Sequence, residues 1–172
     1  MTKATGPLFR VHFRRRREGK TDYSKRLALL KSRIPRLVVR KTNRFIIVQI
    51  IEFGEKGDKT IVSSTSQALA SFGFPGKSNT PSAFLTGLLC GVKAKAKGID
   101  AVVLDTGLHL ASKGSIVYAA LKGAAEAGLK ANFGEEKMPS QERIEGKHLK
   151  GADSFANAKQ KIIAEGAVSK KS

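Results

Sequence analysis

The feature that most constrains the fold of this chain is the concentration of positive charge at its N-terminal end. Fifteen of its 32 Lys and Arg residues lie in residues 1–45, together with two of its 14 Asp and Glu residues. This segment therefore carries +13 of the formal charge of +18. A like-charge block such as RRRR at 14–17 is expected to be disordered by itself and to extend along a polyanion. Because residues 1–20 also lack apolar periodicity, we expect them to form an extended basic arm outside the core.

A compact monomer with this charge would repel itself, so the sequence indicates a polyanionic partner: RNA, DNA or an anionic membrane surface. A membrane is disfavoured, because the longest apolar run, residues 45–51, contains Gln49 and is far shorter than the roughly 20 residues of a spanning helix. No apolar signal-peptide core is expected at the N-terminus. Cys90 alone forms no intramolecular disulfide, and the three histidines are too few for a Cys/His zinc site. We therefore expect a cytoplasmic protein without metal or other cofactors.

The composition of the basic segment favours RNA as the partner. Arginine predominates over lysine there, and guanidinium groups make bidentate contacts with phosphates and stack on bases. Phe9, His12, Phe13 and Tyr23 are interleaved with the cations, which suggests contact with unstacked bases as well as the backbone. A localisation signal or a solubilising tail is the alternative interpretation.

The segment after the arm has the pattern of a helix that ends before Pro35. Thr21 is the expected N-cap, with Asp22 in the first turn. An apolar stripe recurs at helical spacing at Tyr23, Leu27, Leu30 and Ile34. We expect this stripe to pack on the core while the opposite side presents cations.

Residues 36–65 have the pattern of three antiparallel strands. In residues 36–41, Arg36, Val38 and Arg40 share one face and the intervening side chains share the other. Residues 45–53 are almost uniformly apolar, which suggests a strand covered on both faces. A third strand at 59–65 would complete an antiparallel meander.

The rest of the chain alternates helices with one more strand. A short helix is expected around 66–72, and a longer one begins with Thr80 as its cap and Pro81 as its first residue and ends at Gly98. A buried strand is expected at 101–105 and a helix at 115–127. The predicted fold class is α/β: a three-stranded antiparallel meander extended by a further strand into a mixed sheet and packed by helices.

We divide the chain into three parts. These are an extended arm (1–20), an α/β core domain (21–130) and a C-terminal extension (131–172) with short helices and a frayed tail. Within the extension, short helices are expected near 140–146 and 154–165, and no role is indicated for 151–172.

Several segments resemble catalytic motifs but lack parts that the chemistry needs. SFGFPGKS at 71–78 resembles a phosphate-binding loop, yet Ser71 replaces the first glycine and a helix rather than a strand precedes it. GEKGDKT at 54–60 is explained by a hairpin turn. A nuclease with two metal ions needs carboxylates on the first strand, and there are none. Asp105 and His109 lack a nucleophile, and Asp105 is expected to cap or turn the chain, while Cys90 has the pattern of a buried apolar residue. The sequence therefore predicts no enzyme, and a small nucleotide hydrolase is the remote alternative.

KGS at 113–115 has two interpretations. Lys113, Gly114 and the amides at the start of the next helix could contact a phosphate. A plain capped helix start explains the same residues.

The sequence resembles the family of 5S-rRNA-binding ribosomal proteins numbered eighteen in the universal large-subunit scheme, in its archaeal-type form. The resemblance covers about residues 6–150 and is carried by several blocks: RRRREGKTDYSKRLALLKS at 14–32, PRLVVRKTN at 35–43, NTPSAFLTGLLCG at 79–91, VLDTGLH at 103–109, KGS at 113–115 and LKGAAEAGL at 121–129. It implies a ribonucleoprotein role in translation. The protein would bind 5S rRNA and help attach it to 23S rRNA in the central protuberance, beside the large-subunit protein numbered five, and would not function as a homo-oligomer.

Charge and resemblance together give the expected RNA-binding residues. These are Lys3, Arg10, His12, Arg14, Arg15, Arg16, Arg17, Lys20, Tyr23, Arg26, Lys31, Arg33, Arg36, Arg40, Lys41, Arg44, Lys113, Gly114 and Ser115. The resemblance itself implies the arginines at 14–17, Tyr23, Arg26, Lys31, Arg36, Arg40, Lys41 and the KGS loop. A general nucleic-acid-binding protein is the alternative function.

Overall fold

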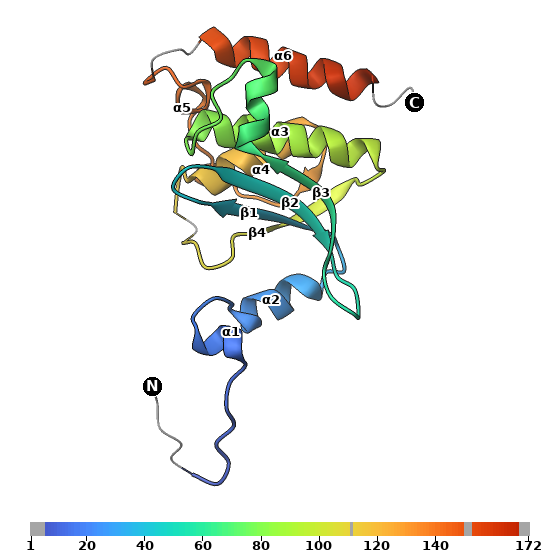
Figure 1. The fold of residues 1–172 in the computed structure, drawn as a ribbon, viewed down its shortest axis with the longest axis vertical. Coiled ribbons are helices and arrows are strands. Elements are labelled where there is room, and N and C mark those ends of the chain that lie inside the picture. Colours follow the sequence, from blue (N-terminus) through green and yellow to red (C-terminus); the bar gives the residue numbers. More distant parts are fainter. Residues whose placement is uncertain (1–5, 111, 150–152, 169–172) are drawn as a thin grey trace.

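The protein has an α/β fold in which helices pack on a mixed sheet (Figure 1). The computed structural model describes residues 6–110, 112–149 and 153–168. Its elements follow in the order α1 (Arg14–Arg17), α2 (Tyr23–Leu30), β1 (Arg36–Lys41), β2 (Ile46–Glu52), β3 (Lys59–Thr65), η1 (Ser66–Phe72), α3 (Thr80–Ala96), β4 (Ala101–Asp105), α4 (Ile116–Glu126), β5 (Lys130–Ala131), η2 (Glu135–Lys137), α5 (Gln141–Glu145) and α6 (Asp153–Val168).

The five strands lie in the order β3-β2-β1-β4-β5. β1, β2 and β3 pair antiparallel, whereas β4 pairs parallel with β1 and β5 parallel with β4. The predicted meander and its extension by a parallel strand are therefore confirmed. The two-residue strand β5 was not predicted, because it is too short to leave a pattern.

The core lies between the sheet and α3 and α4. Leu37 and Val39 of β1 are fully buried in it, while Arg36, Val38 and Arg40 lie on the opposite face, as the alternation predicted. α3 and α4 pack so closely that a Cβ on Gly87 would overlap the carbonyl oxygen of Ala120. Glycine at this crossing therefore sets the separation of the two helices.

α6 forms a further layer over α3, on the side away from the sheet (Figure 1). Phe155, Ala158 and Ile162 are buried there in a cluster with Phe84 and Leu88 of α3. The helix predicted at 154–165 is thus present, and it is longer than the pattern indicated. Among the described residues, no helix is long and apolar enough to cross a membrane.

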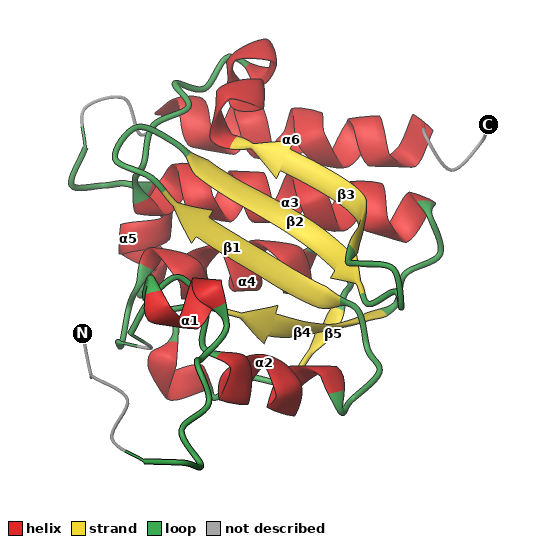
Figure 2. Cartoon of the chain, turned by 60° about the horizontal axis from the view of Figure 1, so that its bottom comes forward, coloured by secondary structure: helices red, strands yellow, loops and turns green. Residues whose placement is uncertain are grey.

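The prediction that β2 is covered on both faces is wrong. Ile46, Val48 and Ile50 are fully buried, but Ile47 and Ile51 on the other face are only half-buried. α3 and α4 cover one face, and the opposite face is open apart from α1 and α2 near one side (Figure 2). A nearly uniform apolar run does not distinguish a strand covered on both faces from one covered on a single face, because isoleucine is tolerated on a half-exposed sheet face.

The arm is not wholly extended as predicted, because Arg14–Arg17 form the helical turn α1. Arginine is a good helix former, which offsets part of the repulsion between neighbouring guanidinium groups. Glu18 reduces that repulsion further, since its carboxylate lies 3.7 Å from Arg14 Nε and 2.9 Å from Lys20 Nζ. All described residues up to Lys20 remain exposed, as expected for an arm.

α2 differs from the prediction in its cap and in the face that it turns inward. Asp22, not Thr21, is the N-cap: its Oδ1 accepts hydrogen bonds from the amides of Ser24 and Lys25 at 3.0 and 3.1 Å. No residue of α2 is buried, and Leu27 of the predicted stripe is 59% exposed. The helix instead faces the sheet with Asp22, Lys25, Arg26 and Leu29, across a cleft. The spacing of apolar residues identified a stripe on α2, but the inward side of the helix is the one on which Arg26 binds Asp58.

The connection from α2 to β1 is short and conformationally specific. Arg33 has φ +54°, the positive value that non-glycine residues rarely adopt. Pro35 follows immediately before β1 and restricts the backbone further. This connection therefore restricts the direction of α2 relative to β1.

The cap of α3 is also shifted by one residue from the prediction. Asn79, rather than Thr80, is the N-cap, and its Oδ1 accepts from the amide of Ser82 at 3.0 Å. Both residues have side chains that cap helices, so the sequence alone did not distinguish them.

Candidate nucleic-acid interface

The arm presents cations with little compensation. The described part of the arm, residues 6–20, holds Arg10, the four arginines of α1 and Lys20, against the single carboxylate of Glu18. Successive side chains of a helix project about 100° apart around its axis. The guanidinium groups of α1 therefore point in several directions and can contact phosphates on more than one side.

Side-chain contacts tie the arm to α2. The ring of Phe13 lies 5.1 Å from that of Tyr23 between centroids, at an interplanar angle of 47°. Arg15 Nε donates a hydrogen bond of 2.9 Å to Thr21 Oγ1. Phe13 and Tyr23, which were expected to contact bases, contact each other in the structure. Together with the hydrogen bond from Arg15, this contact joins the arm, α1 and α2 into one basic unit.

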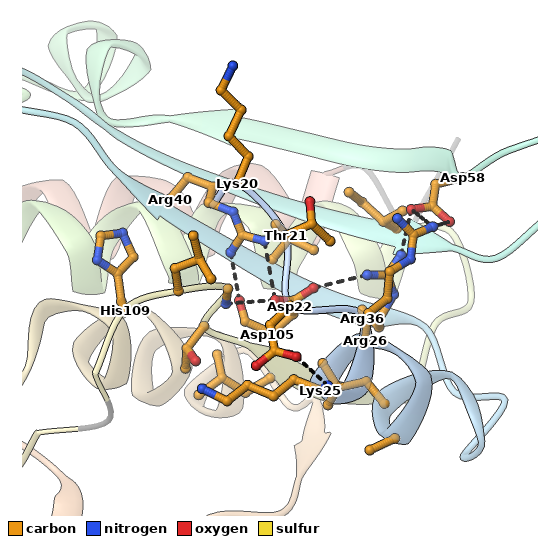
Figure 3. A pocket seen from close by; sticks show the side chains of 18 of the residues that line it. Lys20, Thr21, Asp22, Lys25, Arg26, Arg36, Arg40, Asp58, Asp105 and His109 are labelled. Atoms are coloured by element: carbon orange, nitrogen blue, oxygen red, sulfur yellow. Dashed lines mark hydrogen bonds and ion pairs between the residues drawn. The ribbon is translucent and has the colours of Figure 1, made fainter. Parts of the chain in front are cut away.

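A chain of ion pairs joins this unit to the sheet (Figure 3). Arg26 Nη2 of α2 donates to both carboxylate oxygens of Asp58, at 3.1 and 3.0 Å. The same carboxylate accepts from Arg36 Nη2 at 2.7 Å. Arg36 Nη1 in turn donates to Asp105 at 2.9 Å, and Arg40 Nη2 lies 3.2 Å from the other oxygen of Asp105. Three arginines thus share two aspartates in one continuous network.

Arg36 is the buried centre of that network. The residue is only 4% exposed, and its terminal nitrogens are bonded to Asp58 and Asp105, although Nε has no acceptor among the described residues. A buried charge depends on such partners, because its desolvation is costly. Its placement favours a structural role over direct contact with RNA.

Asp105 also fixes the loop that follows β4. Its Oδ1 accepts from the amide of Gly107 at 2.8 Å, which confirms that Asp105 turns the chain after its strand. Gly107 has φ +61°, and a Cβ there would lie 2.9 Å from Arg40 Cζ. The loop carrying His109 is therefore held against β1 by Arg40 and Asp105.

A cleft of about 710 Å³ lies between α2 and the outer face of the sheet (Figure 3). It brings together five expected RNA-binding residues, all cationic, from the arm, α2 and β1: Arg15, Lys20, Arg26, Arg36 and Arg40. With Lys25, six Arg and Lys side chains line it against three aspartates, a formal surplus of three positive charges.

The remaining expected residues do not line this cleft. Arg10 and His12 are exposed in the arm, Lys31 and Arg33 after α2, and Lys41 and Arg44 around the β1–β2 turn. Lys3 lies outside the described residues. Around the cleft, the exposed cations form a wider basic surface rather than one compact site.

The KGS loop has little free backbone to offer a phosphate. The amide of Gly114 donates to the carbonyl of Lys137 at 3.0 Å, and that of Ser115 to Ser112 at 3.3 Å. The hydroxyl of Ser115 is buried and does not cap α4. Lys113 is exposed, so its ammonium group could contact a phosphate.

The segments that resemble catalytic motifs have structural explanations. The backbone of Gly76 packs so closely on η1 that a Cβ would overlap the carbonyl oxygen of Ser66, and the amide of Lys77 is bonded within the loop. Cys90 is fully buried, and burial raises the pKa of its thiol to about 12, as expected for an unreactive apolar position. Among the described residues, no group of His, Cys, Asp or Glu is placed to hold a metal ion.

Lys25 and His109 line the cleft although they were not among the expected RNA-binding residues, and the aspartates that pair with Arg36 were not expected. Lys25 lies one helical turn before Leu29 and shares its inward face, a signal hidden by the more apolar stripe through Leu27. Asp58 and Asp105 are 22 and 69 residues from Arg36, so only the fold brings them together.

The known proteins that this chain resembles are ribosomal proteins of the large subunit. A family described as "Ribosomal large subunit proteins 60S L5, and 50S L18" matches residues 8–100, from the arm to the end of the connection after α3. Three proteins named large ribosomal subunit protein uL18 are similar to this chain. That of Methanoregula boonei is 48% identical over 94% of this chain and 96% of its own length. Those of Methanoculleus marisnigri and Korarchaeum cryptofilum are 52% and 49% identical, over 85% and 93% of this chain and 84% and 80% of their own lengths.

Proposed function

Because this chain belongs to the family of large-subunit ribosomal proteins that includes 60S L5 and 50S L18, in its archaeal form, it is a structural protein of the large ribosomal subunit; within that subunit, we propose that it binds 5S rRNA. It would help attach 5S rRNA to 23S rRNA in the central protuberance, next to the protein numbered five. It would act there as a single copy.

The observation that carries this proposal is the exposed cationic surface of the arm and α1. Six Arg and Lys side chains face solvent in residues 6–20, and only Glu18 opposes them. Exposed cations that have no acidic partners neutralise phosphates and release condensed counterions, which drives binding to RNA. The guanidinium groups also suit the bidentate recognition of phosphate oxygens.

The two parts of the molecule would contribute differently to the complex. The unit formed by the arm, α1 and α2 would supply phosphate contacts through Arg14–Arg17, Lys20 and Lys31. The core would orient this unit through Arg36 and its aspartates, without itself adding phosphate contacts at that point.

A salt titration tests the mechanism. Binding of the unaltered chain to transcribed 5S rRNA, measured on filters, should weaken steeply with salt. Neutralising about six phosphates predicts a log–log slope of about −4 to −5. Replacing Arg14–Arg17 by alanine should flatten the slope by about 3 units, while the thermal unfolding transition stays within about 2 °C. A flat salt response of the unaltered chain would overturn the mechanism.

The same cations would also serve a general nucleic-acid-binding protein, because phosphate contacts carry no sequence information. Competition distinguishes the two functions. Unlabelled 5S rRNA should displace the labelled RNA at a concentration at least about 100-fold lower than duplex DNA of equal length. Equal competition by both would favour the general binder.

A further inference from the structure

The cleft between α2 and the sheet has the dimensions of a ligand pocket rather than of a phosphate contact. Its volume of about 710 Å³ falls within the range of pockets that enclose small organic ligands. A phosphate group alone needs only a few donors on a surface. The space beneath α2 is therefore larger than phosphate binding explains.

Aliphatic side chains line the cleft beside the ion pairs of Arg36. Val38 of β1 and Ile51 of β2 lie on the outer face of the sheet, and Leu29 of α2 lines the cleft from the helix. Val38 is only 5% exposed, whereas Ile51 and Leu29 are half-buried. Ile51 and Leu29 therefore offer aliphatic surface that a planar ring could cover, and removing that surface from water would be favourable.

Cations surround this aliphatic surface, and the carboxylates in the cleft are already paired. Arg26 and Arg36 neutralise Asp58, Arg36 and Arg40 neutralise Asp105, and Asp22 accepts from the amides of α2. Lys25 and His109 line the cleft from α2 and from the loop after β4, and neither side chain has an ion pair or hydrogen bond among the described residues. The cleft thus combines two unpaired polar side chains, Lys25 and His109, with the aliphatic surface of Ile51 and Leu29.

We propose that this cleft takes one unstacked nucleotide of the bound RNA. Its base would lie between Ile51 and Leu29, and its phosphate would contact Lys25 and Arg15. A base within a duplex is stacked on both faces and paired along one edge, so the nucleotide comes from a loop or a bulge. This inference rests on the proposed function, because it requires RNA as the ligand.

A matched pair of variants tests the cleft without changing charge. Ile51→Trp fills the cleft, whereas Ile47→Trp adds the same side chain on the same face of β2 at a position that does not line it. A base stacks less strongly on an aliphatic surface than on an aromatic ring, so the loss is expected to be moderate. We expect Ile51→Trp to weaken binding to 5S rRNA about tenfold and Ile47→Trp less than about twofold.

Chemical probing identifies the nucleotide in the same complexes. One unpaired base should be protected from dimethyl sulfate or a carbodiimide by the unaltered chain and by Ile47→Trp, and reactive again with Ile51→Trp. Equal affinity and equal protection with the two variants would overturn the inference. Failure of the unaltered chain to bind 5S rRNA would instead overturn the proposed function.

A measurement on the unaltered chain covers the case in which Ile51→Trp fails to fold. Titration with each of the four nucleoside 5′-monophosphates should produce saturable shifts of the amide resonances of Val38, Gly107 and His109. Inorganic phosphate at equal ionic strength should shift them much less. Equal shifts with phosphate alone would mean that no base enters the cleft, and would overturn the inference.

Discussion

α2 and α3 are both helices that begin with a side-chain cap, yet they are stabilised in different ways. α3 buries 13 of its 17 residues between the sheet, α4 and α6, whereas α2 buries none of its eight. An isolated helix of eight residues is unstable in water, because it repays the cost of nucleation with few hydrogen bonds. Burial of apolar surface stabilises α3, while α2 depends on Asp22, on Asp58 and on its connection to β1. The difference predicts that loss of the contacts of α2 affects the stability of the core less than loss of apolar packing around α3.

The largest effect is expected at Arg36 of β1, which is linked to α2 through Asp58. Asp105→Asn removes a charge that pairs with Arg36 and Arg40, and leaves the 4% exposed Arg36 with Asp58 alone. Breaking a buried ion pair costs about 3–5 kcal/mol. Urea denaturation should show this loss of unfolding free energy. Asp100→Asn, which removes an exposed partner of Lys95, is the control and should leave the urea midpoint almost unchanged. Similar losses in both would contradict a structural role for Arg36.

A pair of leucine truncations compares the two helices directly. Leu88→Ala in α3 removes a side chain that is 1% exposed and should cost about 2–5 kcal/mol of unfolding free energy, since it leaves a cavity. Leu27→Ala in α2, at a residue 59% exposed, should change it by less than about 0.5 kcal/mol. Denaturation curves of both variants provide the measurement. A large cost for Leu27→Ala would show that α2 packs on the core after all.

The smallest effect is expected from the contact between α2 and the β2–β3 hairpin. Arg26→Gln removes the guanidinium group that Asp58 holds and leaves the pair between Asp58 and Arg36 in place; the lost pair is partly exposed and worth about 1 kcal/mol or less. Hydrogen exchange of the α2 amides should accelerate about fivefold, while exchange in α3 changes little. Unchanged exchange in α2 would mean that the connection to β1 alone orients the helix.

The sequence predicted what depends on local spacing and missed what depends on distant partners. Alternation in residues 36–41 placed Arg36, Val38 and Arg40 on one face correctly, because the period of a strand is fixed. It could not indicate that Arg36 would meet Asp58 and Asp105, which come from other elements. The apolar stripe through Leu27 was a real pattern, but the pairing of Arg26 with Asp58 turns another side of α2 inward. The cleft follows from that orientation, so it was not predictable from spacing.

The short connection containing Arg33 and Pro35 also limits how the length of the chain can vary. A residue inserted between α2 and the connection would rotate the helix by about 100° relative to the sheet. Asp22, Lys25, Arg26 and Leu29 would then turn away from the cleft, although composition and net charge would be almost unchanged. Substitutions on the exposed side of α2 are tolerable in this geometry, whereas insertions and deletions are not. The register of the helix, and not only its charge, is therefore a property that the basic unit must keep.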